Sequence, residues 1–192
     1  MNLPFTNNQI IVAAAALAVV LIVVLVLYNR HRTNRTAGFK TRFGSEYDRA
    51  VATHGSSNKA ESKLADRETR VEAMKFRELG PAERERFIIQ WNGLQSRFVD
   101  HPKTAVTEAD DLINALLLAR GYPKNDFDQR AADISVTYPG VMENYRLANG
   151  VAIRTGVSEA TTEELRNAMI HYRAVFDELI RPQTPSIVAN AA

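Results

Sequence analysis

The sequence predicts an all-α protein, with one transmembrane helix near the N-terminus followed by a helical bundle-like soluble domain of about six or seven helices. Three observations predict this class. An unbroken apolar run extends from Ile10 to Leu27. Beyond residue 80, apolar residues recur at spacings of three and four, the period of an amphipathic helix. The sequence shows no alternating β-branched run or hairpin turn signal, since Asn149-Gly150 falls inside a helical pattern.

The apolar run has the length of a bilayer-spanning helix. Its 18 residues span roughly 27 Å at roughly 1.5 Å per residue, which is close to the hydrocarbon thickness of a bilayer. A core helix would show a polar face, and this run has none. We therefore expect a short polar head at residues 1–9 and a transmembrane helix at residues 10–28, with Tyr28 at the membrane interface.

A cleaved signal peptide is the main alternative to an anchor. Such a peptide has an apolar core of about 7–15 residues, preceded by positive charge and followed by a small-x-small cleavage site. Residues 1–9 contain no Lys or Arg. Ala16-Leu17-Ala18 fits the cleavage pattern, but cleavage there would leave nine apolar residues on the mature N-terminus. The sequence therefore favours the anchor.

A basic segment follows the apolar run and contains no acid. Because positively charged flanks stay in the cytoplasm, it predicts a single-pass protein of the cytoplasmic (inner) membrane, with the N-terminus outside and the helical domain in the cytoplasm. The same side chains are candidates for contact with anionic lipid headgroups, at about 1 kcal/mol per charge. Alternatively, they serve topology alone. These residues are Arg30, Arg32, Arg35, Lys40 and Arg42.

The charge of the remaining chain argues against nucleic acid as a partner. The net charge of the whole chain is +2, but outside residues 30–42 there are 19 basic and 22 acidic residues. A nucleic-acid-binding domain would carry a basic surface. The chain also has no cysteine, which excludes disulfides and thiolate metal sites.

The first half of the predicted domain begins after a basic juxtamembrane linker at 29–44, in which 33–44 is expected to be a flexible connector. A short helix is expected from Ser45 to about His54. Ser57 is expected to cap the next helix, about 58–76, where Asp66 and Arg70 stand at i,i+4 spacing. Gly80-Pro81 then starts a helix whose apolar stripe is Phe87, Trp91, Leu94 and Phe98.

The second half of the domain extends to residue 181 and precedes a disordered tail at 182–192. Helices are expected at about 103–120, from Asp126 to before Tyr138, and at about 140–154. Thr161 and Glu164 stand at capping-box spacing and open the last helix. Its stripe predicts a core-facing helix, and the alternative is a seam for a partner. The stripe is Leu165, Met169, Tyr172, Phe176 and Leu179.

No motif predicts a catalytic, cofactor-binding or metal-binding residue. The four histidines include no pair at i,i+4 spacing, and His171 is expected to be an ordinary interfacial side chain. Asp126 and Asp128 stand like the start of a calcium loop, but the rest of that pattern is missing. Glu108 and Asp111 share one helix face, which we interpret as solvated. The segment 156–160 lacks the second glycine and the strand of a nucleophile elbow.

A set of short motifs is spread over about 140 residues. The motifs are FGSEYDRAV at 43–51, ERERF at 83–87 with Trp91, QSRFVDHP at 95–102, EAD at 108–110, RGYP at 120–123, DFDQRAADISV at 126–136, EATTEELR at 159–166 and HYR at 171–173. Together they resemble an uncharacterised family of bacterial proteins, usually labelled hypothetical, secreted or membrane proteins. The resemblance implies an N-terminal hydrophobic segment followed by a helical domain, with no established activity. Members often have His where this chain has Asn149.

These observations favour a membrane-tethered helical interaction or scaffold module without catalytic chemistry. Its expected partners are the lipid bilayer, anionic headgroups and a protein that the sequence does not identify. Two alternatives stay open. One is a small enzyme with an all-helical pocket, which would need convergent polar groups. The other is an exported envelope protein, which would place the domain on the opposite side of the membrane.

Overall fold

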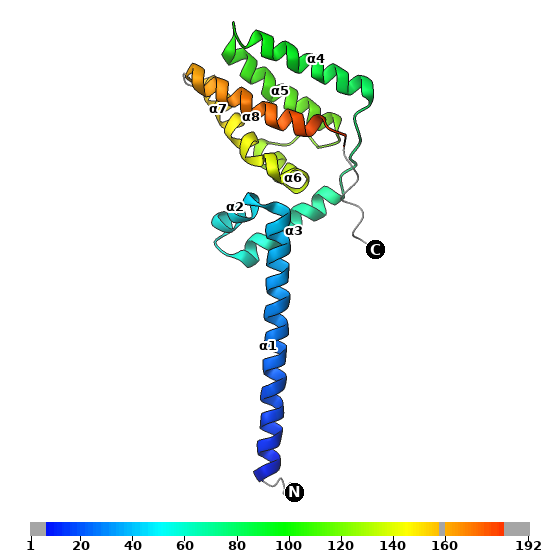
Figure 1. Ribbon diagram of the computed structural model, residues 1–192, viewed down its shortest axis with the longest axis vertical. Helices are drawn as coiled ribbons and strands as arrows, with labels where there is room; N and C mark the ends of the chain where they lie inside the picture. The colour runs from blue at the N-terminus through cyan, green and yellow to red at the C-terminus, as the bar shows by residue number, and fades with distance from the viewer. Residues whose placement is uncertain (1–6, 158–159, 183–192) are drawn as a thin grey trace. The chain divides into compact units, whose positions relative to one another are not determined.

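A computed structural model describes residues 7–157 and 160–182 of the chain (Figure 1). Within these residues all regular structure is helical, as the sequence predicts, and there is no strand. The chain divides into two compact units, residues 1–42 and 43–192. The helices are α1 (Asn7–Phe43), α2 (Ser45–His54), α3 (Ser57–Glu72), α4 (Pro81–Arg97), α5 (Pro102–Ala119), α6 (Phe127–Thr137), the 3-10 helix η1 (Pro139–Val141), α7 (Met142–Val157) and α8 (Thr162–Ile180).

Helix α1 is longer than the sequence predicts, and the expected flexible connector at 33–44 is wrong. The helix continues through Phe43 and is followed by Gly44, whose φ of 52° departs from helical geometry. Extending an existing helix is easier than starting one, and this stretch contains no proline. Inside it, the Thr41 hydroxyl donates to the carbonyl of Ala37, and the Arg42 guanidinium lies 4.9 Å from the centre of the Phe39 ring.

Helices α2 and α3 form an antiparallel hairpin at the start of the second unit. Gly55 ends α2 in the left-handed region, with a φ of 76°. The cap of α3 is Ser56 and not Ser57, because the Ser56 hydroxyl is the group that accepts the backbone N–H of Lys59. Helix α3 also ends at Glu72, four residues before the predicted end at 76.

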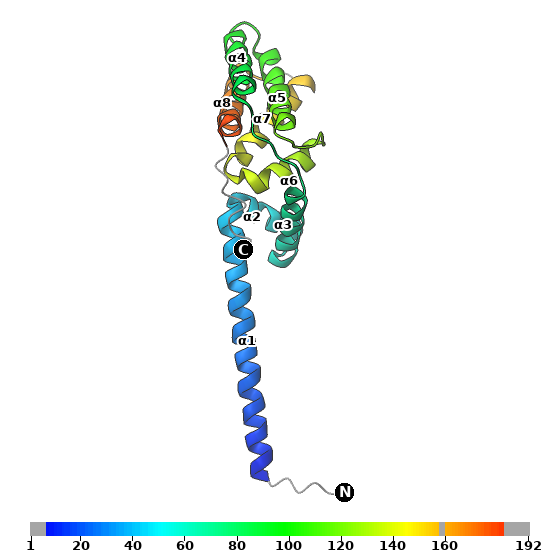
Figure 2. The same ribbon diagram turned by 90° about the vertical axis from the view of Figure 1, so that its right-hand side faces the viewer.

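Helices α4, α5, α7 and α8 form the bundle, in which α5 packs against each of the other three. Figure 2 views the bundle along the axes of several of these helices. The α8 stripe lies wholly inside, which confirms the core interpretation. Phe176 of this stripe stacks on Trp91 of α4, with ring centres 4.8 Å apart. The seven helices α2–α8 match the predicted number of six or seven.

The segment after α3 is fixed to the turn after α5 by a close backbone approach. Gly121 has a φ of 97°, and a Cβ there would lie 2.4 Å from the carbonyl oxygen of Lys75. The backbone N–H of Arg77 donates to the carbonyl of Arg120 at 3.1 Å, and the Phe76 and Tyr122 rings are 4.8 Å apart. Position 121 therefore requires glycine for both its conformation and its space.

The remaining boundaries follow the sequence with small differences. Asp126 caps α6 by accepting the backbone N–H of Gln129, and Thr161 and Glu164 form the predicted capping box of α8. The helix expected from about 140 begins with the 3-10 turn η1, which continues into α7. Residues 1–6 of the predicted head, 158–159 of the loop at 156–160 and 183–192 of the predicted tail lie outside the described residues.

Candidate functional site

The apolar part of α1 is exposed on every side. From Leu17 to Leu27 the exposed fraction of each large apolar side chain lies between 49% and 62%. Among the described residues, α1 is the one helix that is long and apolar enough to cross a membrane, and a signal sequence near an N-terminus has the same properties. In the described part of the second unit the large apolar side chains are mostly buried, and the exposed ones are scattered along the sequence.

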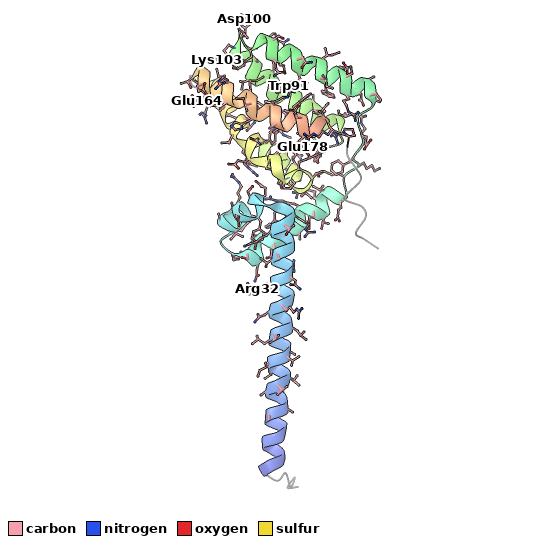
Figure 3. All side chains as sticks on the ribbon, viewed as in Figure 1. Arg32, Trp91, Asp100, Lys103, Glu164 and Glu178 are labelled. Carbon is pink, nitrogen blue, oxygen red and sulfur yellow. The ribbon has the colours of Figure 1, made fainter. Side chains whose placement is uncertain are left out.

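The predicted lipid-facing residues continue on the same helix and form what we call the basic collar. All five side chains are exposed, and Figure 3 labels Arg32 among them. At 100° per residue they point in directions spread around the helix axis, so they do not form a one-sided amphipathic face. The collar consists of Arg30, Arg32, Arg35, Lys40 and Arg42, which the structure brings together along one straight segment.

A polar network lies between the bundle helices and centres on Asp110 of α5. The Tyr172 hydroxyl of α8 donates to Asp110 Oδ1 at 2.8 Å, and the Asn149 amide of α7 donates to the same oxygen at 3.3 Å. The Asn114 amide, one turn along α5, donates to Asp110 Oδ2 at 3.1 Å. Tyr172 and Asn149 are buried, whereas Asp110 is half-buried. Three side-chain donors thus satisfy one carboxylate.

The network continues toward α6 through a second tyrosine. The Tyr145 hydroxyl of α7 donates to Asn114 Oδ1 at 3.3 Å and accepts from Arg130 Nε at 2.8 Å. Arg130 Nη1 also donates to the backbone carbonyl of Asn125 at 3.0 Å. The Asp110 network therefore joins α5, α6, α7 and α8. We use this name for Asp110, Asn114, Arg130, Tyr145, Asn149 and Tyr172.

Burial keeps the two tyrosines of the network protonated. It raises the pKa of Tyr172 well above the ordinary value for tyrosine, and the nearby Asp110 carboxylate raises it further. Burial also raises the pKa of Tyr145 to about 12, against the opposing effect of Arg130. Both hydroxyls are therefore hydrogen-bond donors at neutral pH. In a low-dielectric interior such a satisfied network selects one arrangement of the helices, because any shift would leave a polar group unpaired.

A shallow depression lies at the end of the bundle where α5 and α8 begin. It has a volume of about 310 Å³, and His101, Lys103 and Thr162 are among the residues that line it. Figure 3 shows Lys103 and Glu164 at this end. The side chains of Thr161 and Glu164 already cap α8. This depression is open to solvent and does not enclose a ligand-sized cavity.

The carboxylates singled out from the sequence do not form a site. Glu108 pairs with Arg97 at 2.6 Å on the surface, and Asp111 is exposed. His171 is half-buried with its Nδ1 2.8 Å from Asn144 Oδ1, so it occupies an interfacial position as expected. Among the described residues no three His, Asp or Glu side chains gather as metal ligands.

Sequence reasoning missed the role of Asp110, although a signal for it exists. Val106, Asp110, Ile113 and Leu117 follow one another at spacings of four, three and four, so a carboxylate interrupts an otherwise apolar stripe. A charge at such a position must find partners inside the fold. Asn149 gives a similar signal, because it is a polar residue four positions after Tyr145 on the apolar stripe of its helix.

No known protein family, curated protein or solved structure matches the chain.

Proposed function

We propose that this chain is a single-pass membrane protein whose helical second unit is an interaction or scaffold module on the cytoplasmic side. The exposed apolar surface of α1 carries the proposal. Burying a Val, Leu or Ile side chain is worth about 1.5–3 kcal/mol relative to leaving it in water. The described apolar part of α1 is a continuous series of such side chains without a polar face. A bilayer covers a helix of this kind on all sides.

The basic collar supports both the orientation and a contact with anionic lipid. Since α1 is helical throughout the collar, each residue adds about 1.5 Å along its axis. Arg30, Arg32 and Arg35 then lie within about 12 Å of Leu27, whereas Lys40 and Arg42 lie about 20 Å or more away. The headgroup layer on each side is about 5–7 Å thick, and electrostatic attraction fades over about 8–10 Å. The first three arginines are the headgroup ligands.

The construction of the second unit supports a module that binds a partner through its surface. Its core is continuous through the bundle, and the Asp110 carboxylate is satisfied by side chains of the protein itself. A rigid bundle with a mixed-charge exterior is suited to presenting a fixed surface.

The anchor is tested with a pair of matched substitutions. Ile22 and Ile170 have exposed fractions of 60% and 54%, but only Ile22 lies in the proposed span. Ile22→Arg places a charge at the membrane, at a cost of about 2.5–3.5 kcal/mol on insertion scales. Ile170→Arg changes only the surface of the second unit. Membrane pellets are washed with alkaline carbonate, and the protein left in the pellet is measured.

We expect the native chain and Ile170→Arg to stay in the pellet, and Ile22→Arg to be depleted from it. Intact mass of the mature protein distinguishes an anchor from a signal peptide, since cleavage after Ala18 would remove the first part of the run. Topology is read from Ser62→Cys, an exposed position in a chain without cysteine. An impermeant maleimide should label it only after lysis. Labelling in intact cells would favour the exported envelope protein instead.

A further inference from the structure

The α2–α3 hairpin is built apart from the hydrophobic core of the bundle. Its buried apolar side chains include Tyr47, Leu64 and Val71. Among the described residues, the continuous apolar core begins only at Leu79 and contains no residue of α2 or α3. In Figures 1 and 2 the hairpin lies beside α6 and α7, at one side of the bundle. The buried apolar side chains of the hairpin are therefore separate from the continuous core of the bundle, and polar side-chain contacts join the two parts.

The first polar contact between hairpin and bundle is a buried ion pair. Arg146 of α7 donates from both guanidinium nitrogens to the two carboxylate oxygens of Glu46 in α2, with Nη2 2.9 Å from Oε2. The side chains of Glu46 and Arg146 are 4% and 19% exposed. This two-point contact fixes the position of α2 on α7.

A second ion pair holds α3 on α6. Arg70 Nε lies 2.8 Å from Asp133 Oδ1, and the Asp133 side chain is 1% exposed, whereas the Arg70 side chain is 41% exposed. Beside it, Arg67 Nη1 lies 3.4 Å from Ser135 Oγ. Asp133 also accepts a hydrogen bond from Gln129 Nε2 at 2.8 Å, and Asn125 Nδ2 lies 3.4 Å from its other oxygen. Since both of these partners lie outside the hairpin, removal of Arg70 leaves the Asp133 carboxylate with two hydrogen-bond donors.

The far end of the hairpin is attached in a different way. The segment after α3 is joined to the turn after α5 by the Arg77–Arg120 backbone hydrogen bond and the close approach at Gly121. These contacts carry no charge and involve the backbone. A hairpin held by ion pairs along its length and by backbone contacts at its end has the construction of a hinged arm.

We propose that the α2–α3 hairpin is a hinged arm, which docks on α6 and α7 through the Glu46–Arg146 and Arg70–Asp133 pairs and undocks as a unit about residues 73–79. Buried ion pairs contribute little net stability, because separated charges regain their hydration. Polar interfaces between parts of one chain commonly move for this reason. The arm lies between α1 and the bundle in the sequence, so undocking changes the segment that connects them.

The test measures the distance between the arm and the bundle in the full chain, held in non-ionic detergent. Spin labels are placed at Ser62→Cys in α3 and Asp128→Cys in α6, both exposed positions in a chain without cysteine. A reference pair at Glu85→Cys and Asn167→Cys lies within the bundle. Pulsed electron resonance gives the distance distribution of each pair.

Glu46→Gln should raise the population of longer arm–bundle distances by at least about tenfold, since it removes one partner of a buried pair. The swap Glu46→Arg with Arg146→Glu should restore the short distance. Raising the salt concentration to about 1 M should also increase the population of longer arm–bundle distances in the native chain. Glu163→Gln, which breaks an exposed pair with Arg166, is the matched control and should change nothing.

Emission from the single tryptophan, Trp91, reports the state of the bundle core in each sample. Arm movement with unchanged Trp91 emission and an unchanged reference distance supports the proposal. If Glu46→Gln and high salt both leave the arm–bundle distance unchanged, the hairpin is a rigid part of the bundle and the proposal is overturned. Loss of the Trp91 signal together with the arm contact would also overturn it, because the two parts would then unfold as one.

Discussion

The hydroxyl of Tyr172 lies 2.8 Å from Oδ1 of Asp110 and donates a hydrogen bond to it. This bond joins the last helix of the chain to the central helix of the bundle across 62 residues of sequence. The ring of Tyr172 belongs to the apolar stripe of α8, and its hydroxyl belongs to the Asp110 network. One side chain therefore contributes to core packing and to the polar contact that sets the position of α8 on α5.

Tyr172→Phe should lower the free energy of unfolding by about 1.5–3 kcal/mol, because a carboxylate loses a buried donor while the ring is kept. Tyr122→Phe is the matched control. The Tyr122 and Thr137 hydroxyls are neighbours, but among the described residues neither meets hydrogen-bond geometry with any partner. Removing the Tyr122 hydroxyl should be neutral or slightly stabilising. Urea unfolding of residues 43–182 measures both variants, and equal losses would contradict the role given to Asp110.

Phe176→Ala should destabilise the second unit by about 3–5 kcal/mol, since it empties the position stacked on Trp91. A loss of this size approaches the whole stability of many domains. Ile170→Ala, on the exposed side of the same helix, should change the free energy of unfolding by less than about 0.5 kcal/mol. Thermal unfolding followed by circular dichroism compares the two. If Phe176→Ala melts within about 2 °C of the native protein, the Phe176 ring does not contribute to the core as assigned.

The bundle should lose stability in alkali in a defined range of pH. Burial raises the pKa of Tyr145 to about 12 and also raises the pKa values of Tyr122 and Tyr172, whereas an unfolded tyrosine titrates near about 10. Below about pH 10 the folded and the unfolded chain both keep these protons, so the tyrosines do not lower the free energy of unfolding. As the pH rises from there through about 12, the unfolded chain releases protons that the folded chain retains, so unfolding is favoured.

Phenolate absorbance and circular dichroism followed together test this pH dependence. The buried tyrosines should ionise in the same transition in which helical structure is lost. Tyr145→Phe should lose less stability over this range, because one of the three groups is removed. Gradual ionisation of all six tyrosines near pH 10 in a chain that stays folded would show that these hydroxyls reach solvent.

The two ends of the basic collar should contribute unequally to lipid selectivity. Charges near the membrane surface are worth up to about 1 kcal/mol each, and the effect fades over about 8–10 Å. Replacing Arg30, Arg32 and Arg35 with Gln should therefore abolish most of the preference for anionic lipid. Replacing Lys40 and Arg42 should change it little. The association of spin-labelled phosphatidylserine with the full chain in nanodiscs measures this preference. Equal effects of the two sets of substitutions would show that distance from the membrane does not decide which charges attract the lipid.

Local sequence determined the helices and most of their ends. The capping box of Thr161 and Glu164 involves groups three residues apart, and the α8 stripe depends only on helical periodicity. Such features need no knowledge of the rest of the chain, which is why the last helix and its buried face were predicted correctly. The prediction of a flexible connector at 33–44 is wrong, because polar composition alone does not distinguish a flexible segment from a solvated helix. Its side chains instead bond back to the preceding helical turn.

Partner choice between helices was decided only by the tertiary structure. The sequence places Arg70 four residues after Asp66, but Arg70 pairs with Asp133, 63 residues away. Asp66 lies instead near Lys63 on the exposed face of α3. A buried carboxylate such as Asp133 has more to gain from a cation than an exposed one, because water already satisfies the latter. Spacing along one helix cannot reveal which carboxylate will be buried.

The sequence by itself determined the helical class, the single long apolar segment, the basic collar and the core face of α8, because each depends on residue type and short-range periodicity. Only the tertiary structure decided that Asp110 is surrounded by donors from two other helices, and that the α2–α3 hairpin meets the bundle through Glu46 and Asp133. These contacts join residues far apart in the chain, so they form only after the helices have packed.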